Sequence, residues 1–261
     1  MRDRLSFTRF LGLGFEDRIP DGTTLWLFRE KLVKAELIDD LFAQFNRHLE
    51  AKGYIARSGQ MIDATIVQTP KQRNSREENA QVKAGKTPAA WEEKPQKKRQ
   101  KDTDARWTKK HGKSYFGYKN HVNADTKHKF IRIYNVTDAS IHDSQKLDAL
   151  IDDANTSCDL YADSAYRSAE AERKLKARGI RSHIHERGTR NHPLTERQKK
   201  SNRKKSKVRA RVEHVFAAQE MASGGRLVRT VGIARAKVKI GLQNLCYNIR
   251  RLATLERIAA I

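Results

Sequence analysis

Apolar side chains recur at two different spacings along this chain, and the change from one to the other outlines its elements. Near the start they recur every three or four positions, as at Leu25, Phe28 and Leu32. This spacing predicts two helices with one buried face each, and Gly53 is suited to end the second. Residues 1–53 are therefore expected to form a small N-terminal helical segment.

The next apolar segments are short, β-branched runs of the kind typical of strands. Residues 61–67 form one such run, with Asp63 in its middle and Pro70 beyond its end. Two or three further strands are expected between Tyr115 and Val136, with residues 125–128 as a turn. These strands would form an antiparallel meander.

The second half of the chain alternates between strands and helices. A helix capped by Asp143 or Ser144 is expected first, and the last helix carries apolar residues from Val238 to Leu252. Between them the pattern predicts a strand at 159–163, a helix over 168–178, a strand at 182–185 and a helix through 208–216. This order predicts an α/β fold in which a mixed central sheet is flanked by helices.

Residues 71–110 differ from the rest of the chain because they are strongly hydrophilic. They contain Pro88, Pro95, many charged side chains and almost no aliphatic ones. Such a segment buries too little apolar surface to offset its chain entropy, so it is expected to be a long, mobile, basic insertion after the first strand. A DNA-clamping arm and a solvated linker explain it equally well.

The chain carries a large excess of positive charge. Its 261 residues include 54 Lys and Arg against 31 Asp and Glu, which gives a formal net charge of +23. Such a surface attracts polyanions, and nucleic acid is the commonest of these. No apolar run approaches the roughly 18 residues that span a bilayer, and no signal-peptide pattern opens the chain. A cytoplasmic protein without a membrane partner is therefore expected.

The cysteine content is low. Cys158 and Cys246 are the two cysteines, and each has apolar neighbours in sequence. They are expected to be buried thiols, which excludes a disulfide framework and a zinc site with four protein ligands.

Three acidic residues stand out by position: Asp63 in the first strand, Asp163 at the end of a later strand, and Glu213 on a helix. Each alone has an ordinary explanation, which is a solvent-facing strand residue, a helix N-cap and an intrahelical pair with Arg209, respectively. Acids that converge from separate elements can also hold two Mg²⁺ ions about 4 Å apart and so cleave phosphodiester bonds. Together the three acids point to that chemistry.

Many short segments, in order along nearly the whole chain, match the motifs of one known family. They are Arg4–Phe7 with Arg9–Leu13, Asp21–Arg29, Ile62–Val67, Tyr118–Val122, Val136–Ser140 with His142–Ser144, Ala162–Tyr166, Arg211–Phe216, Val228–Gly232 and Asn244–Asn248. On these segments the chain resembles the DDE transposases of bacterial insertion sequences, in the insertion-sequence-five group.

The resemblance implies a ribonuclease H-like catalytic domain over residues 54–261 that uses Mg²⁺, with two ions per site. It implies that Asp63, Asp163 and Glu213 are both the catalytic residues and the metal ligands. The implied activity is hydrolysis at the inverted-repeat ends of the element and strand transfer into target DNA, so double-stranded DNA is the expected partner. A homo-oligomer on the DNA and association with the bacterial nucleoid are expected as well.

Four basic residues are candidates for DNA contacts. The resemblance implies that Arg209, four positions before the glutamate, touches DNA. Lys119 and His121 lie on a strand near the expected active edge, where contact with phosphates and a solvated strand face are equally good explanations. Arg167 follows Asp163 and is a candidate for positioning the end of a DNA strand.

Two features separate the chain from the usual family pattern. The position seven residues after Glu213 is Glu220, where the family has a lysine, and a carboxylate there would repel phosphate. Met1 almost abuts the first matching segment, which indicates a truncated copy. Both favour an alternative, a catalytically inactive transposase that only binds DNA. A ribonuclease or repair nuclease on the same fold is a further alternative, which a preference for inverted-repeat ends would exclude.

Overall fold

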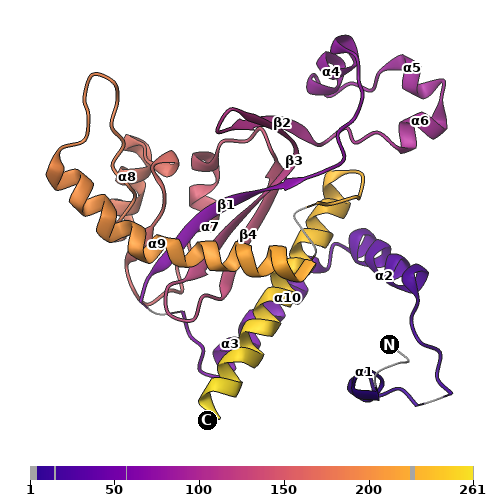
Figure 1. The fold of residues 1–261 in the computed structure, drawn as a ribbon, viewed down its shortest axis with the longest axis horizontal. Coiled ribbons are helices and arrows are strands. Elements are labelled where there is room, and N and C mark those ends of the chain that lie inside the picture. The colour runs from indigo at the N-terminus through magenta and orange to yellow at the C-terminus, as the bar shows by residue number, and fades with distance from the viewer. Residues whose placement is uncertain (1–4, 15, 57, 224–226, 261) are drawn as a thin grey trace.

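The computed structural model describes residues 5–14, 16–56, 58–223 and 227–260, and its centre is a sheet with helices on both faces (Figure 1). Arg4, where the first family segment begins, lies outside the described residues, as does the start of the predicted 1–53 segment. No helix in the described ranges is long and apolar enough to cross a membrane.

The sheet has six strands. They are β1 (Gln60–Gln68), β2 (Arg106–Lys110), β3 (Lys113–Asp125), β4 (Ile131–Asp138), β5 (Asp159–Tyr161) and β6 (Arg181–Ser182). Their order is β2-β3-β1-β5-β6, and β4 also pairs with β3. Strands β1 and β3, β2 and β3, and β3 and β4 are antiparallel, whereas β1 and β5, and β5 and β6, are parallel. The expected mixed sheet flanked by helices is therefore confirmed.

The helices fall into an N-terminal group, a group between β1 and β2, and a group after β4. They are α1 (Leu5–Phe10), α2 (Gly22–Ala35), α3 (Ile38–Ala51), α4 (Arg76–Lys83), α5 (Ala89–Glu92), α6 (Pro95–Arg99), α7 (Leu147–Leu150), α8 (Ala169–Ala177), α9 (Glu196–Ser223) and α10 (Ile233–Ala259), with 3₁₀ turns η1 (Asp143–Lys146) and η2 (Ser164–Tyr166). The two helices predicted before Gly53 are confirmed, and they pack along α10 (Figure 1).

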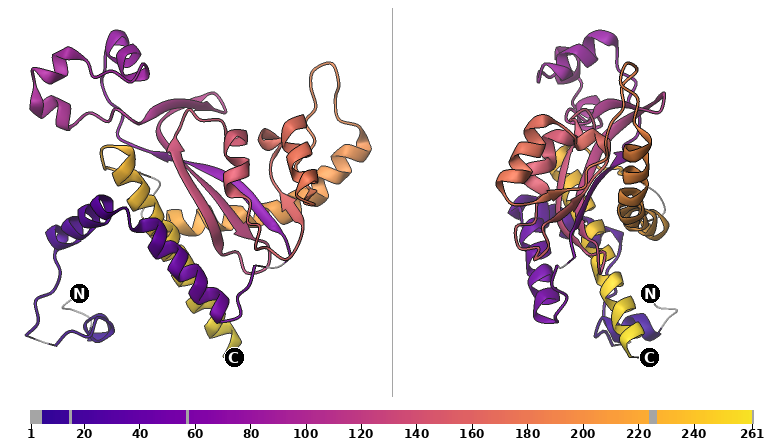
Figure 2. Two further views of the ribbon diagram at one scale, coloured as in Figure 1. Left: turned by 180° about the vertical axis from the view of Figure 1, so that it is seen from behind. Right: turned by 90° about the vertical axis from the view of Figure 1, so that its left-hand side faces the viewer.

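Alternating side chains on β1 separate two hydrophobic cores. Ile62 points to one face, where it packs with Leu150, Leu160 and the helices α7 and α8. Met61 points to the other face, where it packs with Val215 of α9 and with residues of α3. Successive side chains of a strand point to opposite faces, so each position on β1 is assigned to one core. Figure 2 shows α8 and α9 on opposite sides of the sheet.

Residues 71–110, which the sequence analysis expects to form a long mobile insertion, contain regular structure. Helices α4, α5 and α6 occupy much of this segment, and its last five residues form β2. Trp91 is fully buried, and its indole Nε1 donates a hydrogen bond of 2.6 Å to Glu78. Glu78 also closes a capping box with Ser75 at the start of α4. One buried aromatic side chain and these polar contacts stabilise the helices of this segment, although it contains few aliphatic residues.

Two strands, β3 and β4, occupy the range in which two or three were expected, because the polar residues of β3 are buried with partners, such as Asn120 with Asn244. Two other predictions need correction. Strand β6 is shorter than the predicted 182–185. Both Cys158 and Cys246 are exposed free thiols, although their neighbours in sequence are apolar. Sequence neighbours on a helix or at a strand end do not share a burial environment, so they are a poor guide to burial.

Candidate functional site

Asp63 lies on β1, and Asp163 comes two residues after the end of its parallel neighbour, β5. Strand β1 pairs in parallel with β5, with Gln60 opposite Leu160 and Met61 opposite Tyr161. Extending this register by two residues sets Asp63 opposite Asp163, which follows β5 in an extended conformation. Both share the parity of Met61, so both carboxylates face α9.

Each aspartate uses one oxygen for local backbone structure. Asp63 Oδ1 accepts a hydrogen bond from the backbone N–H of Ala64, at 2.8 Å. Asp163 Oδ1 accepts one from Ala165, also at 2.8 Å, and so caps the turn η2. The N-cap interpretation of Asp163 is therefore confirmed, and it fixes the orientation of a carboxylate whose other oxygen stays directed away from the cap.

The environment of Asp63 disfavours its charged form. Burial is the largest effect, and it raises the pKa of Asp63 to about 6; Arg209 opposes the rise and the nearby charge of Asp163 adds to it. A buried carboxylate beside a second carboxylate is electrostatically costly unless a cation compensates both. Such pairs of hard oxygen donors are suited to divalent cations.

Arg209, on α9, connects the first aspartate to the predicted glutamate. Its Nη1 lies 2.8 Å from Asp63 Oδ2, and its Nη2 lies 3.6 Å from Glu213 Oε1. The predicted pair of Arg209 with Glu213 on one helix face is therefore confirmed. The Nε of Arg209 is buried without a hydrogen-bond partner in the described part of the chain. The guanidinium thus provides the positive charge beside the buried aspartate.

Glu213 stands apart from the two aspartates. Its side chain is 64% exposed, and no three acidic, His or Cys side chains among the described residues lie close enough together to hold a metal ion. The three-acid convergence expected from the sequence is therefore only partly assembled, with Asp63 and Asp163 adjacent. Carboxylates repel one another, and Arg209 occupies the space between Asp63 and Glu213. Glu220 lies further along α9 and is exposed.

Two residues near the aspartates received little or no weight from the sequence. Tyr166 is fully buried, its hydroxyl has no hydrogen-bond partner among the described residues, and burial, Asp143, Asp63 and Asp163 raise its pKa well above 10. The pKa of His185 is lowered by burial, Arg209 and Lys205, and Asp163 opposes this. A clue to His185 was its position in the predicted strand beside the strand of Asp163.

Lys119 and His121 lie on the opposite face of the sheet from Asp63. They alternate with Val122, which pairs with Asp63, so their side chains point toward the α7 face. Lys119 Nζ donates to Asp143, at 2.8 Å, and to the carbonyl of Ile141, at 2.7 Å. Strand parity therefore places the side chains of Lys119 and His121 on the face opposite Asp63, and their proposed contacts with DNA stay a prediction.

His121 is fully buried, and its Nε2 lies 2.9 Å from the hydroxyl of Thr137. Burial lowers the pKa of His121 to about 4, although Asp143 opposes the change, so the imidazole is neutral near pH 7. A neutral, buried side chain is not available to a DNA phosphate, and the predicted DNA contact of His121 has no support in this arrangement.

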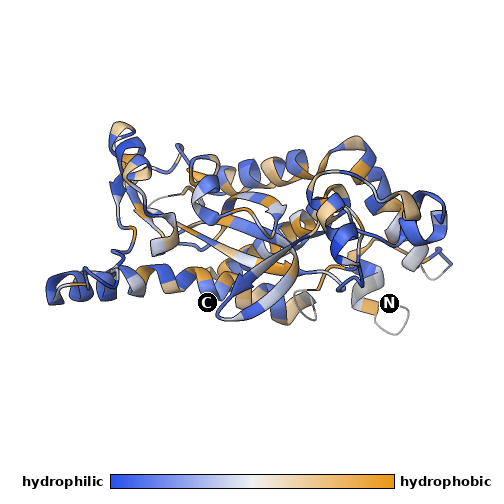
Figure 3. Cartoon of the chain, turned by 90° about the horizontal axis from the view of Figure 1, so that it is seen from above, coloured by the Kyte–Doolittle hydropathy of each residue, from blue (hydrophilic) through white to orange (hydrophobic). Residues whose placement is uncertain are grey.

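Arg167 lies near the aspartates but is paired with acids. Its Nη1 is 3.0 Å from Glu186 and 3.7 Å from Glu172, and it donates to the carbonyl of Ile184. These contacts join the turn after Asp163 to the segment after β6. The first part of α9, in contrast, consists mostly of hydrophilic residues (Figure 3), and many of them are exposed.

Comparison with known proteins identifies the family. A family described as the transposase DDE domain matches residues 55–249, and a second, a transposase domain (DUF772), matches residues 1–31. The transposase for insertion sequence element IS1106 of Neisseria meningitidis serogroup B is 32% identical over 232 residues, which cover 87% of this chain and 76% of the relative. No solved structure shows significant similarity. The chain therefore belongs to the DDE transposase family.

Proposed function

We propose that this transposase cuts DNA at the inverted-repeat ends of its insertion sequence and joins them to target DNA, with Asp63, Asp163 and Glu213 as its metal-binding carboxylates. The observation that carries the proposal is that Asp63, on β1, lies close enough to Asp163, just after the parallel strand β5, for the charge of Asp163 to raise its pKa. Two acids in this position, with the pKa of Asp63 raised to about 6, are suited to a cation held between them.

The donor set fits Mg²⁺ because it consists of carboxylate oxygens. Asp63 and Asp163 would hold the metal, and Glu213 on α9 would complete the set. When bound, divalent ions supply Lewis-acid activation of water and stabilisation of the leaving 3′ oxygen. The residues themselves orient these charges: the backbone N–H groups of Ala64 and Ala165 fix one oxygen of each aspartate, and Asp63 is partly shielded from water.

Arg209 would act as the counter-ion of Asp63 and as a contact to the DNA backbone. Its guanidinium bonds to Asp63 and lies near Glu213, and its other N–H groups remain for a phosphate. Release of the Asp63 contact would free this carboxylate for a cation. Arg209 would then meet the negative charge of DNA beside the same site.

The strand order supports a ribonuclease H-like fold for residues 54–261. Strands β4, β3 and β1 are successive antiparallel neighbours, and β5 and β6 continue the sheet in parallel. Asp63 lies on the central strand and Asp163 follows its parallel neighbour. Membership of the insertion-sequence-five group, assembly as a homo-oligomer on DNA and association with the nucleoid remain predictions from the resemblance.

Cleavage of the element's own terminal repeat tests the proposal. The full chain would be incubated with labelled duplex carrying that repeat, with Mg²⁺, Mn²⁺ or EDTA. Metal-dependent cleavage at the repeat end is expected, and Asp163→Ala should lower it by about 10³-fold or more. Asp153→Ala, which removes an exposed acid, is the matched control. Binding without metal-dependent cleavage would instead select the inactive DNA-binding alternative, and equal cleavage of unrelated duplex would select a general nuclease.

A further inference from the structure

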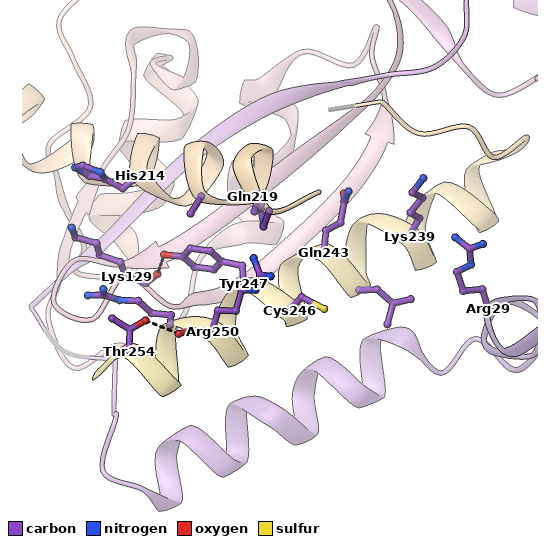
Figure 4. Close-up of a pocket in the computed structure, with 14 residues that line it drawn as sticks. Arg29, Lys129, His214, Gln219, Lys239, Gln243, Cys246, Tyr247, Arg250 and Thr254 are labelled. Atoms are coloured by element: carbon purple, nitrogen blue, oxygen red, sulfur yellow. Dashed lines mark hydrogen bonds between the residues drawn. The ribbon is translucent and has the colours of Figure 1, made fainter. Parts of the chain in front are cut away.

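A groove with a volume of about 640 Å³ lies between α9 and α10 (Figure 4), and neither Asp63 nor Asp163 lines it. Fourteen residues line it: Arg29, Lys129, His214, Ala218, Gln219, Ala222, Lys239, Leu242, Gln243, Cys246, Tyr247, Arg250, Arg251 and Thr254. Small and apolar side chains of the two helices form part of its lining. Five Lys and Arg side chains also line it, and none of the residues that line it is acidic.

The cations gather at the two ends of the groove. Arg29 and Lys239 lie at one end, whereas Lys129 and Arg250 lie at the other, beside His214 (Figure 4). Lys239 and Arg250 are both on α10, eleven residues apart, which corresponds to about 17 Å at 1.5 Å per residue. Phosphates of one DNA strand advance by about 3.4 Å per nucleotide along the helix axis while they turn around it, so a separation of about 17 Å is within reach of two phosphates of the same strand.

At both ends, cations have other cations as neighbours. The pKa of Lys129 is lowered by burial, then by Arg251 and Arg211. The pKa of Lys239 is lowered by burial, then by Arg29 and Arg229. Gathering like charges in a partly buried groove costs free energy, which a bound polyanion recovers.

The arginines at the Lys129 end are held in place by carbonyl groups instead of acids. Arg251 Nε donates to the carbonyl of His128, at 2.8 Å, and Arg211 Nη1 donates to that of Thr126, at 3.2 Å. The hydroxyl of Tyr247 donates to the carbonyl of Lys129. The turn between β3 and β4 thus orients the guanidinium groups without neutralising them, so they remain able to bind phosphate oxygens.

We propose that this groove between α9 and α10 binds the sugar–phosphate backbone of one strand of a DNA duplex, at a second surface besides the aspartate site. The inference rests on the proposed function only for the identity of the partner, DNA. Charge complementarity favours DNA because the groove presents cations at both ends, none of its lining residues is acidic, and the protein has a net positive charge. A phosphate at each end would satisfy both groups at once.

Salt-dependent binding tests the groove without any cleavage. Affinity of the full chain for a labelled duplex would be measured in EDTA by fluorescence anisotropy at several salt concentrations. The double variant Lys239→Gln/Arg250→Gln should lower the slope of log affinity against log salt by about 1.8, at roughly 0.9 per lost phosphate contact. Arg173→Gln/Lys176→Gln, which removes two exposed charges from α8 on the other face of the sheet, should leave the slope nearly unchanged. An equal change in both variants would overturn the proposal.

Cys246 provides a second, local readout. It is exposed and lines the groove, whereas Cys158 is exposed just before β5. A duplex with a phosphate tethered to a mixed disulfide should exchange with the Cys246 thiol and release the small thiol. Cross-linking should disappear in Cys246→Ser and persist in Cys158→Ser. Cross-linking to Cys158 alone, or displacement of the groove contact by inorganic phosphate but not by duplex, would contradict the proposal.

Failure of the groove and failure of the proposed function are distinguishable. If the groove variants bind like the wild type but Asp163→Ala abolishes cleavage, the groove proposal fails and the transposase site stands. If the groove variants lose the salt-dependent contacts while the wild type does not cleave, the groove stands and the proposed cleavage fails.

Discussion

Both faces of the central sheet carry charged or polar side chains, but these side chains have different partners on the two faces. On the α9 face, Asp63 and Asp163 lie beside each other, and Arg209 is the cation that bonds to Asp63. On the α7 face, Lys119 is bonded to Asp143 and to a backbone carbonyl, and His121 is bonded to Thr137. The first face has two acids close together, whereas on the second each of these side chains has at least one hydrogen-bond partner.

The difference shows how a functional strand residue is distinguished from a structural one. Functional and structural polar residues both interrupt an apolar run, so the sequence of the run alone does not distinguish between them. Buried polar groups in a stable core are expected to have partners, and those of Lys119 are close to complete. Asp63 instead has a like charge next to it and a raised pKa, a combination that is frequent at reactive sites.

The largest expected effect is a difference in cleavage activity between variants of the two faces. Asp163→Asn should reduce metal-dependent cleavage by about 10³-fold, because it removes an anionic ligand from the reacting site. Asp143→Asn, which changes the partner of Lys119, should leave cleavage per folded molecule within about fivefold and act on stability instead. Gel-based rates, normalised to the folded fraction from circular dichroism, measure both. Comparable losses in the two variants would mean that the α7 face takes part in catalysis.

The next effect concerns acid stability on the α7 face. The folded-state pKa of His121 is lowered from 6.5 to about 4, so the stability that its neutral form contributes is complete above pH 6.5 and is lost as the pH falls through 4. The loss is roughly 3 kcal/mol, from 1.36 kcal/mol per pKa unit. His121→Gln should therefore lose that much less stability than the wild type between pH 6.5 and 4, as urea unfolding would measure. If the unfolding free energies of the variant and the wild type change in parallel with pH, His121 is not held neutral in the folded protein.

A somewhat smaller effect of opposite sign is expected on the α9 face. The folded-state pKa of Asp63 is raised from 3.8 to about 6, so its contribution to stability is complete below pH 3.8 and is lost as the pH rises through 6. The loss is roughly 2 to 3 kcal/mol, because the side chain is mostly buried. Asp63→Asn should remove this decline, so its unfolding free energy should gain on that of the wild type from pH 4 to 6.5. If the unfolding free energy of the wild type instead rises relative to that of Asp63→Asn over this pH range, the effect of Arg209 on the pKa of Asp63 outweighs that of burial.

The order of elements was predictable from the sequence because the period of apolar residues reports local structure. The helices before Gly53, strand β1, the turn after β3, and helices α8 and α10 were all predicted near their observed positions. The segment 71–110 was not, because its order depends on one buried aromatic residue, Trp91, and on polar contacts between residues distant in sequence. The amino-acid composition of a segment does not reveal such individual contacts.

The candidate site was predictable in its residues but not in its geometry. Motifs singled out Asp63, Asp163 and Glu213, but only the pairing of β1 with β5 sets the first two side by side. The face on which Lys119 and His121 lie depends on strand register, which shifts every side chain when it moves by one residue. The cationic groove was missed because Arg29, Lys129 and Lys239 come from three separate elements and share no sequence pattern.

Binding of Mn²⁺ to the full chain tests the central claim most directly, because it probes the carboxylates without DNA or cleavage. Free Mn²⁺ would be measured by electron paramagnetic resonance during titration of the wild type, Asp63→Asn, Asp163→Asn and Asp143→Asn. The account predicts saturable binding by the wild type and by Asp143→Asn, and at least about tenfold weaker binding by the other two variants. Equal binding by all four proteins, or a loss confined to Asp143→Asn, would contradict the assignment of the metal site to the α9 face.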